Sequence, residues 1–295
     1  MKMKELGALV LLASMWGASF LFMKVAVAEL GPLVTSAVRV LLAGLALLAY
    51  ALLIGSRPDL LSRWKQYLLL GAINAALPFA LICAAELHLA ASLAAILNAT
   101  TPLFTALVAL GWLREPIGWR KGAGLLLGVF GVSILVGWHP DSLESGSAFY
   151  TAAGLSLLAA LSYAFGGIYA SRTFTGTASL DLAVGQQLAA SVWLVPVALV
   201  TLPEHLPSMA TVWSVLALSL LCTAVAYLLY FFLLQSVGPV KTLSVTFLVP
   251  LFGVVWGTIF LNESLSMNTL LGLIVIFVSI LMVTLQKKKK LLPTA

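Results

Sequence analysis

The chain has 295 residues, of which 62% are hydrophobic and 9% are charged, whereas roughly a quarter of the residues of a soluble domain are charged. A mean hydropathy of +1.10, spread along the whole chain, excludes a water-soluble fold of this size. The formal net charge of +6 includes a run of lysines at 287–290, without a basic stripe and interleaved aromatic residues, so nucleic-acid binding is not expected. Cys83 and Cys222 lie in separate apolar stretches and predict neither a disulfide framework nor a metal site.

Ten apolar segments follow one another along the chain, each close to the roughly 20 residues that cross a bilayer core as a helix. Charged residues, glycines or prolines separate them. The predicted fold class is therefore an all-α integral membrane protein with ten transmembrane helices. The expected spans are 6–27, 32–54, 67–88, 91–112, 118–137, 149–170, 180–201, 211–235, 241–261 and 268–285.

The first segment has an alternative interpretation as a secretory signal. Lys2 and Lys4 precede an apolar run, and residues 26–28 read Ala-Val-Ala, which resembles a cleavage site. However, the apolar run from Leu6 to Met23 is longer than a usual signal core, and Lys24 interrupts its end. A similar segment also recurs in mid-chain, where no signal could stand, so we expect a membrane helix.

The basic residues predict the orientation of the chain, because short loops with many Lys and Arg stay on the cytoplasmic side. With the amino terminus inside, 14 of the 16 basic residues fall in cytoplasmic segments, while the external loops carry acidic residues instead. The other two, Lys24 and Arg39, fall within the first and second predicted helices. Both termini are therefore expected in the cytoplasm, and the expected location is the inner (cytoplasmic) membrane.

An internal repeat with a fixed offset of 148 residues is the strongest signal in the sequence. The pattern Pro-Leu-Phe, eight residues, Leu, one residue, Glu occurs at 102–115 and again at 250–263. The same offset, without a gap, aligns Gly124 with Gly272 and maps the first five predicted helices onto the last five. Because five is odd, the second copy enters the membrane in the opposite sense, as in the inverted repeats of secondary transporters.

The repeat also predicts how the chain is divided. We expect a first five-helix unit at 1–140, a second at 149–286, and a basic cytoplasmic tail at 287–295. Ser14 and Ser162 align under the same offset.

These motifs resemble a known family. The segment Trp16-Gly17-Ala18-Ser19-Phe20, the two Pro-Leu-Phe segments that lead to Glu115 and Glu263, and the Gly-rich helices after them resemble the EamA-type transporters of the drug/metabolite transporter superfamily. The resemblance covers about residues 6–285 and implies ten helices, a central cavity lined mainly by helices 1, 3, 4, 6, 8 and 9, and export or exchange of amino acids and related metabolites. The second copy departs from the first, with Tyr163-Ala164 in place of Trp16-Gly17, so cavity residues need not pair by symmetry.

The prolines at 102 and 250 are expected to kink the fourth and ninth helices. Each frees the carbonyl four residues earlier, in Asn98 and Thr246 respectively, and such groups are tolerated where they are buried in protein or line a polar cavity. Asn98, Thr101 and Thr246 are therefore candidate substrate contacts beside Pro102 and Pro250. The alternative is a packing kink whose polar groups are satisfied by neighbouring helices.

Two basic residues are predicted within the membrane, where a buried charge is costly unless it is paired or hydrated. Lys24 lies near the outer end of the first helix, within snorkelling reach of the headgroups, and we expect it to extend there. Arg39 lies roughly 10 Å below the outer surface by the helical rise. Its expected partner is either Glu86, near the outer end of the third helix, or a substrate carboxylate. Lys24 and Glu86 are thus candidates for charge pairing or gating.

Other polar or aromatic side chains within the predicted helices are candidate substrate contacts. The alternatives are bonds between packed helices and interfacial aromatic belts. These residues are Trp16, Ser19, Asn74, Tyr163, Gln186, Gln187, Tyr227 and Tyr230.

The charge pattern also narrows the function. No Asp or Glu falls near the centre of a predicted helix, which disfavours a proton-driven exporter of lipophilic cations and favours a zwitterionic or anionic metabolite, such as an amino acid. The sequence has no H-E-x-x-H or G-x-S-x-G motif for catalysis and no G-x-x-x-x-G-K-[ST] motif for nucleotide binding, so a membrane-embedded enzyme and a nucleotide-driven pump are not expected.

The sequence therefore predicts a secondary transporter, an exporter or exchanger, that works by alternating access around a midplane cavity. A lipid-carrier flippase or a multidrug exporter of the same superfamily is the alternative. The expected partners are a small-molecule substrate and membrane lipid, without a cofactor or metal. One copy suffices for such a carrier, and the sequence leaves the oligomeric state open.

Overall fold

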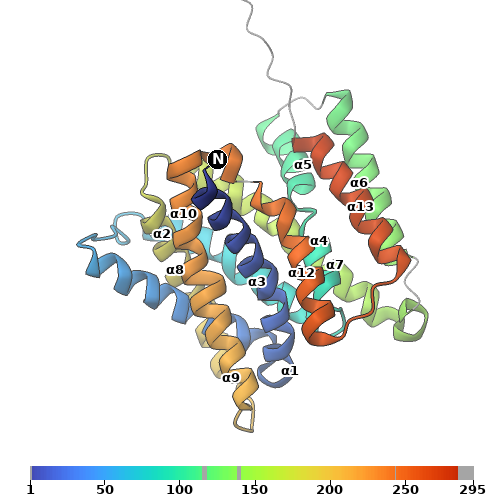
Figure 1. The fold of residues 1–295 in the computed structure, drawn as a ribbon. Helices are drawn as coiled ribbons and strands as arrows, with labels where there is room; N and C mark the ends of the chain where they lie inside the picture. The colour runs from blue at the N-terminus through green and yellow to red at the C-terminus, as the bar shows by residue number, and fades with distance from the viewer. Residues whose placement is uncertain (1, 115–117, 138–140, 243, 285–295) are drawn as a thin grey trace, which may run out of the picture.

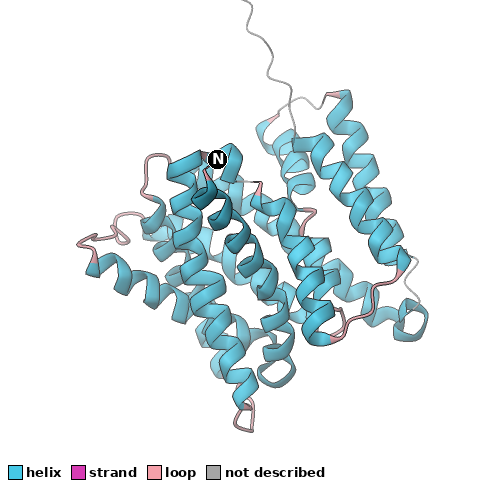
Figure 2. Cartoon of the chain, viewed as in Figure 1, coloured by secondary structure: helices cyan, strands magenta, loops and turns pink. Residues whose placement is uncertain are grey.

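The computed structural model describes residues 2–114, 118–137, 141–242 and 244–284, which form helices joined by short connections and contain no strand (Figures 1 and 2). Eight helical spans in this part of the chain are long and apolar enough to cross a membrane, and α12 (Val245–Leu261) is apolar but shorter. The described residues thus have the all-helical membrane architecture that composition predicts. The start of α1 and the end of α13 lie at the same end of the bundle (Figure 1).

The longest helix, α1 (Met3–Leu53), contains the first two predicted segments. It bends at Gly31, whose φ of 72° and ψ of 168° are not helical, and Pro32 follows. Glycine adopts a positive φ without a Cβ clash, and the proline removes one main-chain donor at the bend. The two arms pack against α8 (Ser179–Leu199), α12 and the middle of the span 209–237.

The remaining spans of the first half are interrupted. One consists of α2, the π-helix η1 and α3, at Trp64–Gly71, Ala72–Ala76 and Leu77–Glu86. The next consists of α4 (Ala91–Asn98) and α5 (Thr101–Leu113), and α6 (Trp119–Gly137) follows.

The second half has a matching order. α7 (Asp141–Thr173) bends at Gly146, where φ is 57°, and α8 follows it. The next span consists of α9 (Met209–Leu216), the π-helix η2 (Ala217–Val225) and α10 (Ala226–Val237). α11 (Pro239–Thr242), α12 and α13 (Met267–Thr284) complete the described chain.

The two repeat-related prolines have different effects on their helices. At Pro102 the helix is interrupted rather than kinked, because α4 ends at Asn98 and α5 begins at Thr101. Proline is favourable in the first turn of α5, where its missing N–H has no helical acceptor. Pro250, by contrast, lies inside α12, which continues through it.

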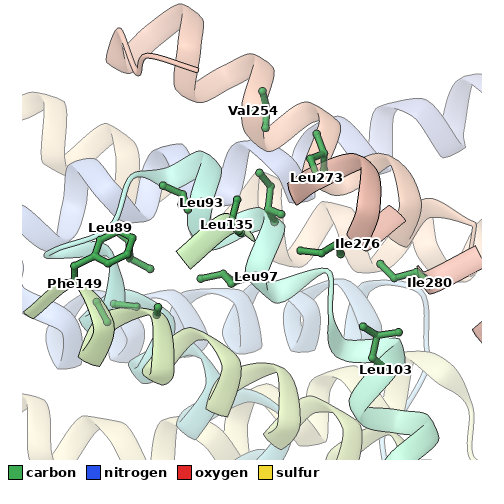
Figure 3. Close-up of a cluster of buried hydrophobic side chains, with 14 of the residues drawn as sticks. Leu89, Leu93, Leu97, Leu103, Leu135, Phe149, Val254, Leu273, Ile276 and Ile280 are labelled. Carbon is green, nitrogen blue, oxygen red and sulfur yellow. The ribbon is translucent and has the colours of Figure 1, made fainter. Parts of the chain in front are cut away.

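The largest apolar cluster joins the later helix of each half to the elements around it. Leu135 of α6 packs with Leu273 and Ile276 of α13, and these two helices lie side by side (Figures 1 and 3). The cluster extends to Leu97 of α4 and to Phe149 of α7. It therefore fastens the α6–α13 pair to the rest of the bundle.

The α1–α12 contact depends on glycine. A Cβ atom at Gly17 would lie 2.6 Å from Cβ of Phe252 and 2.8 Å from the main-chain nitrogen of Gly253. Small residues let membrane helices approach closely, so this contact holds the first arm of α1 against α12.

Gly17→Ala should lower stability by about 1–3 kcal/mol, because the added methyl group overpacks a contact with main chain on the other side. The measurement is thermal unfolding of the detergent-solubilised protein, followed by size-exclusion chromatography. Gly167→Ala is the matched control, since a Cβ there has no atom within 4 Å. Equal unfolding temperatures for the two variants would contradict the close α1–α12 contact.

Candidate functional site

The two π-helices lie at repeat-related positions, and each carries a polar side chain. The 148-residue offset moves residues 72–76 of η1 onto 220–224, within η2. π-helical turns are rare and are frequent at functional sites. η1 contains Asn74 and η2 contains Thr223, so both halves present a polar group where the helix is widened.

A chain of amide and hydroxyl groups crosses between the halves. Asn74 Nδ2 donates to Gln186 Oε1 at 2.7 Å, and Gln186 Nε2 donates to Tyr227 Oη at 3.0 Å. Gln187 is fully buried and lies beside Tyr227. The structure thus brings Asn74, Gln186 and Tyr227 together, from η1, α8 and α10.

Arg39 lies in the interior of the bundle, 5% exposed. Its Nε donates to Thr223 Oγ1 at 3.1 Å, and its Nη1 donates to Met23 Sδ at 3.2 Å. The guanidinium carbon lies 3.8 Å from the ring centroid of Phe79, a cation–π geometry. A guanidinium has five N–H donors, so several remain after these contacts.

No contact of Arg39 in the described part of the chain is with a carboxylate. The pair with Glu86, one of the two expected alternatives, is not formed, because the Glu86 carboxylate has no hydrogen-bond partner. Tyr163 and Tyr227 lie within electrostatic reach of Arg39, and the Tyr163 ring centroid is 6.3 Å from that of Phe79. Arg39 is therefore a buried cation whose direct contacts, among the described residues, include no carboxylate.

Lys24 bonds main-chain carbonyls at the end of a predicted membrane span, and its expected reach to the headgroups stays a prediction. Its ammonium donates to the main-chain carbonyl of Glu86 and, at 2.8 Å, to that of Leu89. The last carbonyls of a helix have no partner within the helix, and a cation also suits the negative end of the helix dipole. Lys24 thus holds the end of α3 against α1.

Glu263 makes the corresponding contact at the start of α4. Its carboxylate accepts the main-chain N–H groups of Ala91 at 2.6 Å and of Ser92 at 3.0 Å. A carboxylate at a helix N-terminus satisfies free donors and interacts favourably with the helix dipole. The end of α12 is therefore tied to the start of α4, whereas the repeat mate Glu115 lies outside the described residues.

The proline-associated candidates lie at the α4–α5 interruption and on α12. The Asn98 carbonyl, which Pro102 cannot bond, accepts the Thr101 hydroxyl at 2.7 Å. The side-chain oxygen of Asn98 is buried and has no partner. Thr246 is partly buried in the first turn of α12. These groups form a set separate from the hydrogen-bonded chain around Gln186.

The aromatic candidates of the first arm form a third group. The rings of Trp16 and Tyr230 have centroids 5.8 Å apart, and Ser19 Oγ donates to the Trp16 carbonyl at 2.6 Å. Both rings are partly exposed and border an apolar cluster of α1, α10 and α12.

Sequence reasoning missed the direct partners of Arg39, because Met23, Phe79 and Thr223 are ordinary residues in a membrane helix. The repeat offset contains a signal that could have found one of them. It aligns Arg39 with Gln187 and Phe79 with Tyr227, so two neighbouring pairs occupy equivalent places in the two halves.

Comparison with known proteins defines the class as a helical membrane transporter. The profile of the EamA-like transporter family matches the chain twice, at residues 3–137 and 151–285. The chain belongs to this family, and hence to the drug/metabolite transporter superfamily; it is a multi-pass membrane transporter and not an enzyme.

Relatives with this architecture are similar over nearly their whole length. The chain is 30% identical to the "Uncharacterized inner membrane transporter YedA" of Escherichia coli K12 (95% of this chain, 90% of the relative). It is 29% identical to the "Uncharacterized transporter YvbV" of Bacillus subtilis (95% and 91%). "Protein PecM" of Dickeya dadantii is 25% identical, over 94% of this chain and 93% of the relative. A solved crystal structure aligns with a TM-score of 0.63 at 16% identity, over 92% of this chain and 95% of its own, and supports the fold alone.

Gln186→Leu should lower stability by about 1–3 kcal/mol, because it removes the partner of the partly buried Asn74 amide and Tyr227 hydroxyl. Asn74→Leu combined with Gln186→Leu should cost less than the sum of the single variants, since each loses the same hydrogen bond. Denaturant unfolding of the four proteins in a double-mutant cycle measures the difference. Strict additivity would show that the 2.7 Å contact contributes nothing.

Proposed function

We propose that this protein is a secondary transporter that exports or exchanges small zwitterionic or anionic metabolites such as amino acids. Arg39 is the observation that carries the proposal. Burying a charge in a membrane protein is costly without a counter-charge, and the contacts of Arg39 are a hydroxyl, a thioether and a ring. A substrate carboxylate would supply the missing anion in the bidentate geometry that guanidinium favours.

The rest of the proposed site follows from the groups near Arg39. With the carboxylate at Arg39, the phenols of Tyr163 and Tyr227 and the amides of Asn74 and Gln186 provide donors and acceptors for the other polar atoms of the substrate. A positive guanidinium repels cations, so multidrug export of cationic compounds is the weaker alternative.

The proposed topology has ten crossings and both termini in the cytoplasm. The two arms of α1 count separately on either side of Gly31, and α12 is the ninth crossing. An even number of crossings agrees with the common end reached by the start of α1 and the end of α13. The proposed units, 1–140 and 149–286, overlap the two matches to the family profile.

The proposed mechanism is alternating access, and the conformation described here is proposed to be closed at the outer end. At the outer end, Lys24 and Glu263 bridge α1, α3, α4 and α12. Beyond the interruption at Ala99 and Thr100, α5 packs on α7 and α13, whereas α4 packs on α12 as well as on α7. The two halves of this span thus share α7 and differ in their other main neighbour.

Arg39→Met should raise the KM for a transported amino acid roughly 30- to 150-fold, since a hydrogen-bonded interaction with a charge contributes about 2–3 kcal/mol. Uptake into proteoliposomes, first screened with a panel of amino acids, gives the measurement. Arg57→Met is the matched control, because Arg57 is exposed in the loop after α1. An unchanged KM in Arg39→Met would remove Arg39 from the site.

Glu263→Gln should shift the carrier towards the outward-open state, because the carboxylate's charge-assisted bonds to Ala91 and Ser92 are replaced by weaker ones. In a variant with Ser92→Cys as its only cysteine, labelling by a membrane-impermeant maleimide from outside should become roughly 5- to 30-fold faster for a loss of about 1–2 kcal/mol. Glu204→Gln, in an exposed loop, is the control. Equal labelling rates would show that the Glu263 contact does not hold the outer end closed.

A further inference from the structure

Glu86 is a buried carboxyl group that the proposed substrate site does not use. It is the last residue of α3 and is 0% exposed. Both of its carboxylate oxygens are buried and have no hydrogen-bond partner among the residues that the structure describes. An ionised carboxylate accepts several hydrogen bonds in water, so burial without any of them strongly disfavours the charged form.

The two nearby cations do not replace those hydrogen bonds. Lys24, from the first arm of α1, directs its ammonium to the main-chain carbonyls of Glu86 and Leu89 rather than to the carboxylate. Arg39, from the second arm, is engaged with Thr223, Met23 and Phe79, and Phe79 is about two helical turns before Glu86 on α3.

The other elements around Glu86 offer little that would stabilise a negative charge. Glu263, after α12, is itself acidic, and two N–H groups of α4 hold its carboxylate. α4 has no charged residue. α7 places Phe149 in the same apolar cluster as Ala85 and Leu89, the neighbours of Glu86 (Figure 3). Among the sequence neighbours of Glu86, the Cys83 thiol is buried in α3, and His88 is exposed beyond the end of that helix.

Glu86 lies among the contacts that are proposed to close the outer end, because Lys24 and Glu263 both lie within electrostatic reach of its carboxyl group. Lys24 spans the turn from Glu86 to Leu89, and Glu263 holds the start of α4 two residues further on. Opening of the outer end has to separate these contacts, and water would then reach the carboxyl group.

We infer that Glu86 is a proton-binding site of the outer end: it carries a proton while that end is closed and releases the proton to the outside when the end opens. This inference rests on the proposed alternating access but not on the class of substrate. Closure then takes up one proton from the external solution.

The sign of the pH effect follows from this linkage. The closed state holds one proton more than the open state, in which an exposed glutamate ionises above about pH 4.3. Raising the external pH therefore favours the open state, and the ratio of open to closed carrier should rise by up to about tenfold per pH unit. Acidification favours closure.

The experiment measures the open fraction directly, without substrate. Ser92→Cys, in a background with Cys83→Ala and Cys222→Ala, is labelled from outside by an impermeant maleimide between pH 6 and pH 8. The rate is divided by that of Leu206→Cys, in the same background, because Leu206 is 97% exposed and reacts in either state. This ratio removes the intrinsic pH dependence of the thiol. It should increase several-fold per pH unit.

Glu86→Gln keeps the size and neutrality of the protonated acid. It should label slowly at every pH, whereas Glu204→Gln, in an exposed loop, should behave as the parent does. A parent ratio that is independent of pH, or a pH dependence that persists in Glu86→Gln, overturns the inference. If Glu86→Gln does not fold, the parent slope decides alone. A negative result beside intact amino-acid transport would reject the proton site and leave the proposed function standing.

Discussion

Hydrocarbon offers no hydrogen bonds, so each polar group that enters the membrane must find its partner within the protein. Most described polar groups of this chain obey that constraint through main-chain atoms. Lys24 bonds the end of α3, Glu263 bonds the start of α4, and Ser162 Oγ donates at 2.6 Å to the Ile73 carbonyl in η1. These bonds satisfy main-chain groups that are left without a helical partner where a helix ends or becomes π-helical. Arg39, whose contacts among the described residues include no carboxylate, and Glu86, whose carboxyl group has no hydrogen-bond donor there, are the two ionisable side chains on which the proposals rest.

The internal repeat explains why the scaffold is symmetric while the proposed site is not. Both halves contain a π-helix at the equivalent position, yet Asn74 of η1 aligns with Cys222 of η2. Likewise the cation Arg39 aligns with the neutral amide Gln187. Duplication supplies two equivalent helical frames, and divergence of a few side chains places a cation in one frame and a neutral amide at the equivalent position of the other. This asymmetry suits a zwitterionic or anionic substrate, whose carboxylate needs one defined place.

Composition and the 148-residue offset were sufficient to predict a helical membrane fold with an internal repeat, and the resemblance of a few motifs pointed to the family, because these patterns extend along the chain. The local geometry of the helix ends was harder to predict from the sequence. Pro102 predicted a kink, but a break at Ala99 and Thr100 satisfies the freed carbonyl of Asn98 with a hydroxyl. The acceptors of Lys24 could not be predicted either, because the carbonyls after α3 come within its reach only when α3 packs beside α1. The spacing that predicts a helix also does not distinguish α-helical from π-helical turns.

The central claim is that a buried guanidinium recognises the carboxylate of the substrate. Its most direct test is calorimetric binding to the purified protein in lipid nanodiscs, with each amino acid of a panel compared with its own methyl ester. The ester keeps the side chain and the amino group and removes only the negative charge. We expect the acids that bind to do so at least tenfold more tightly than their esters. Esters that bind as tightly as the parent acids would contradict the account.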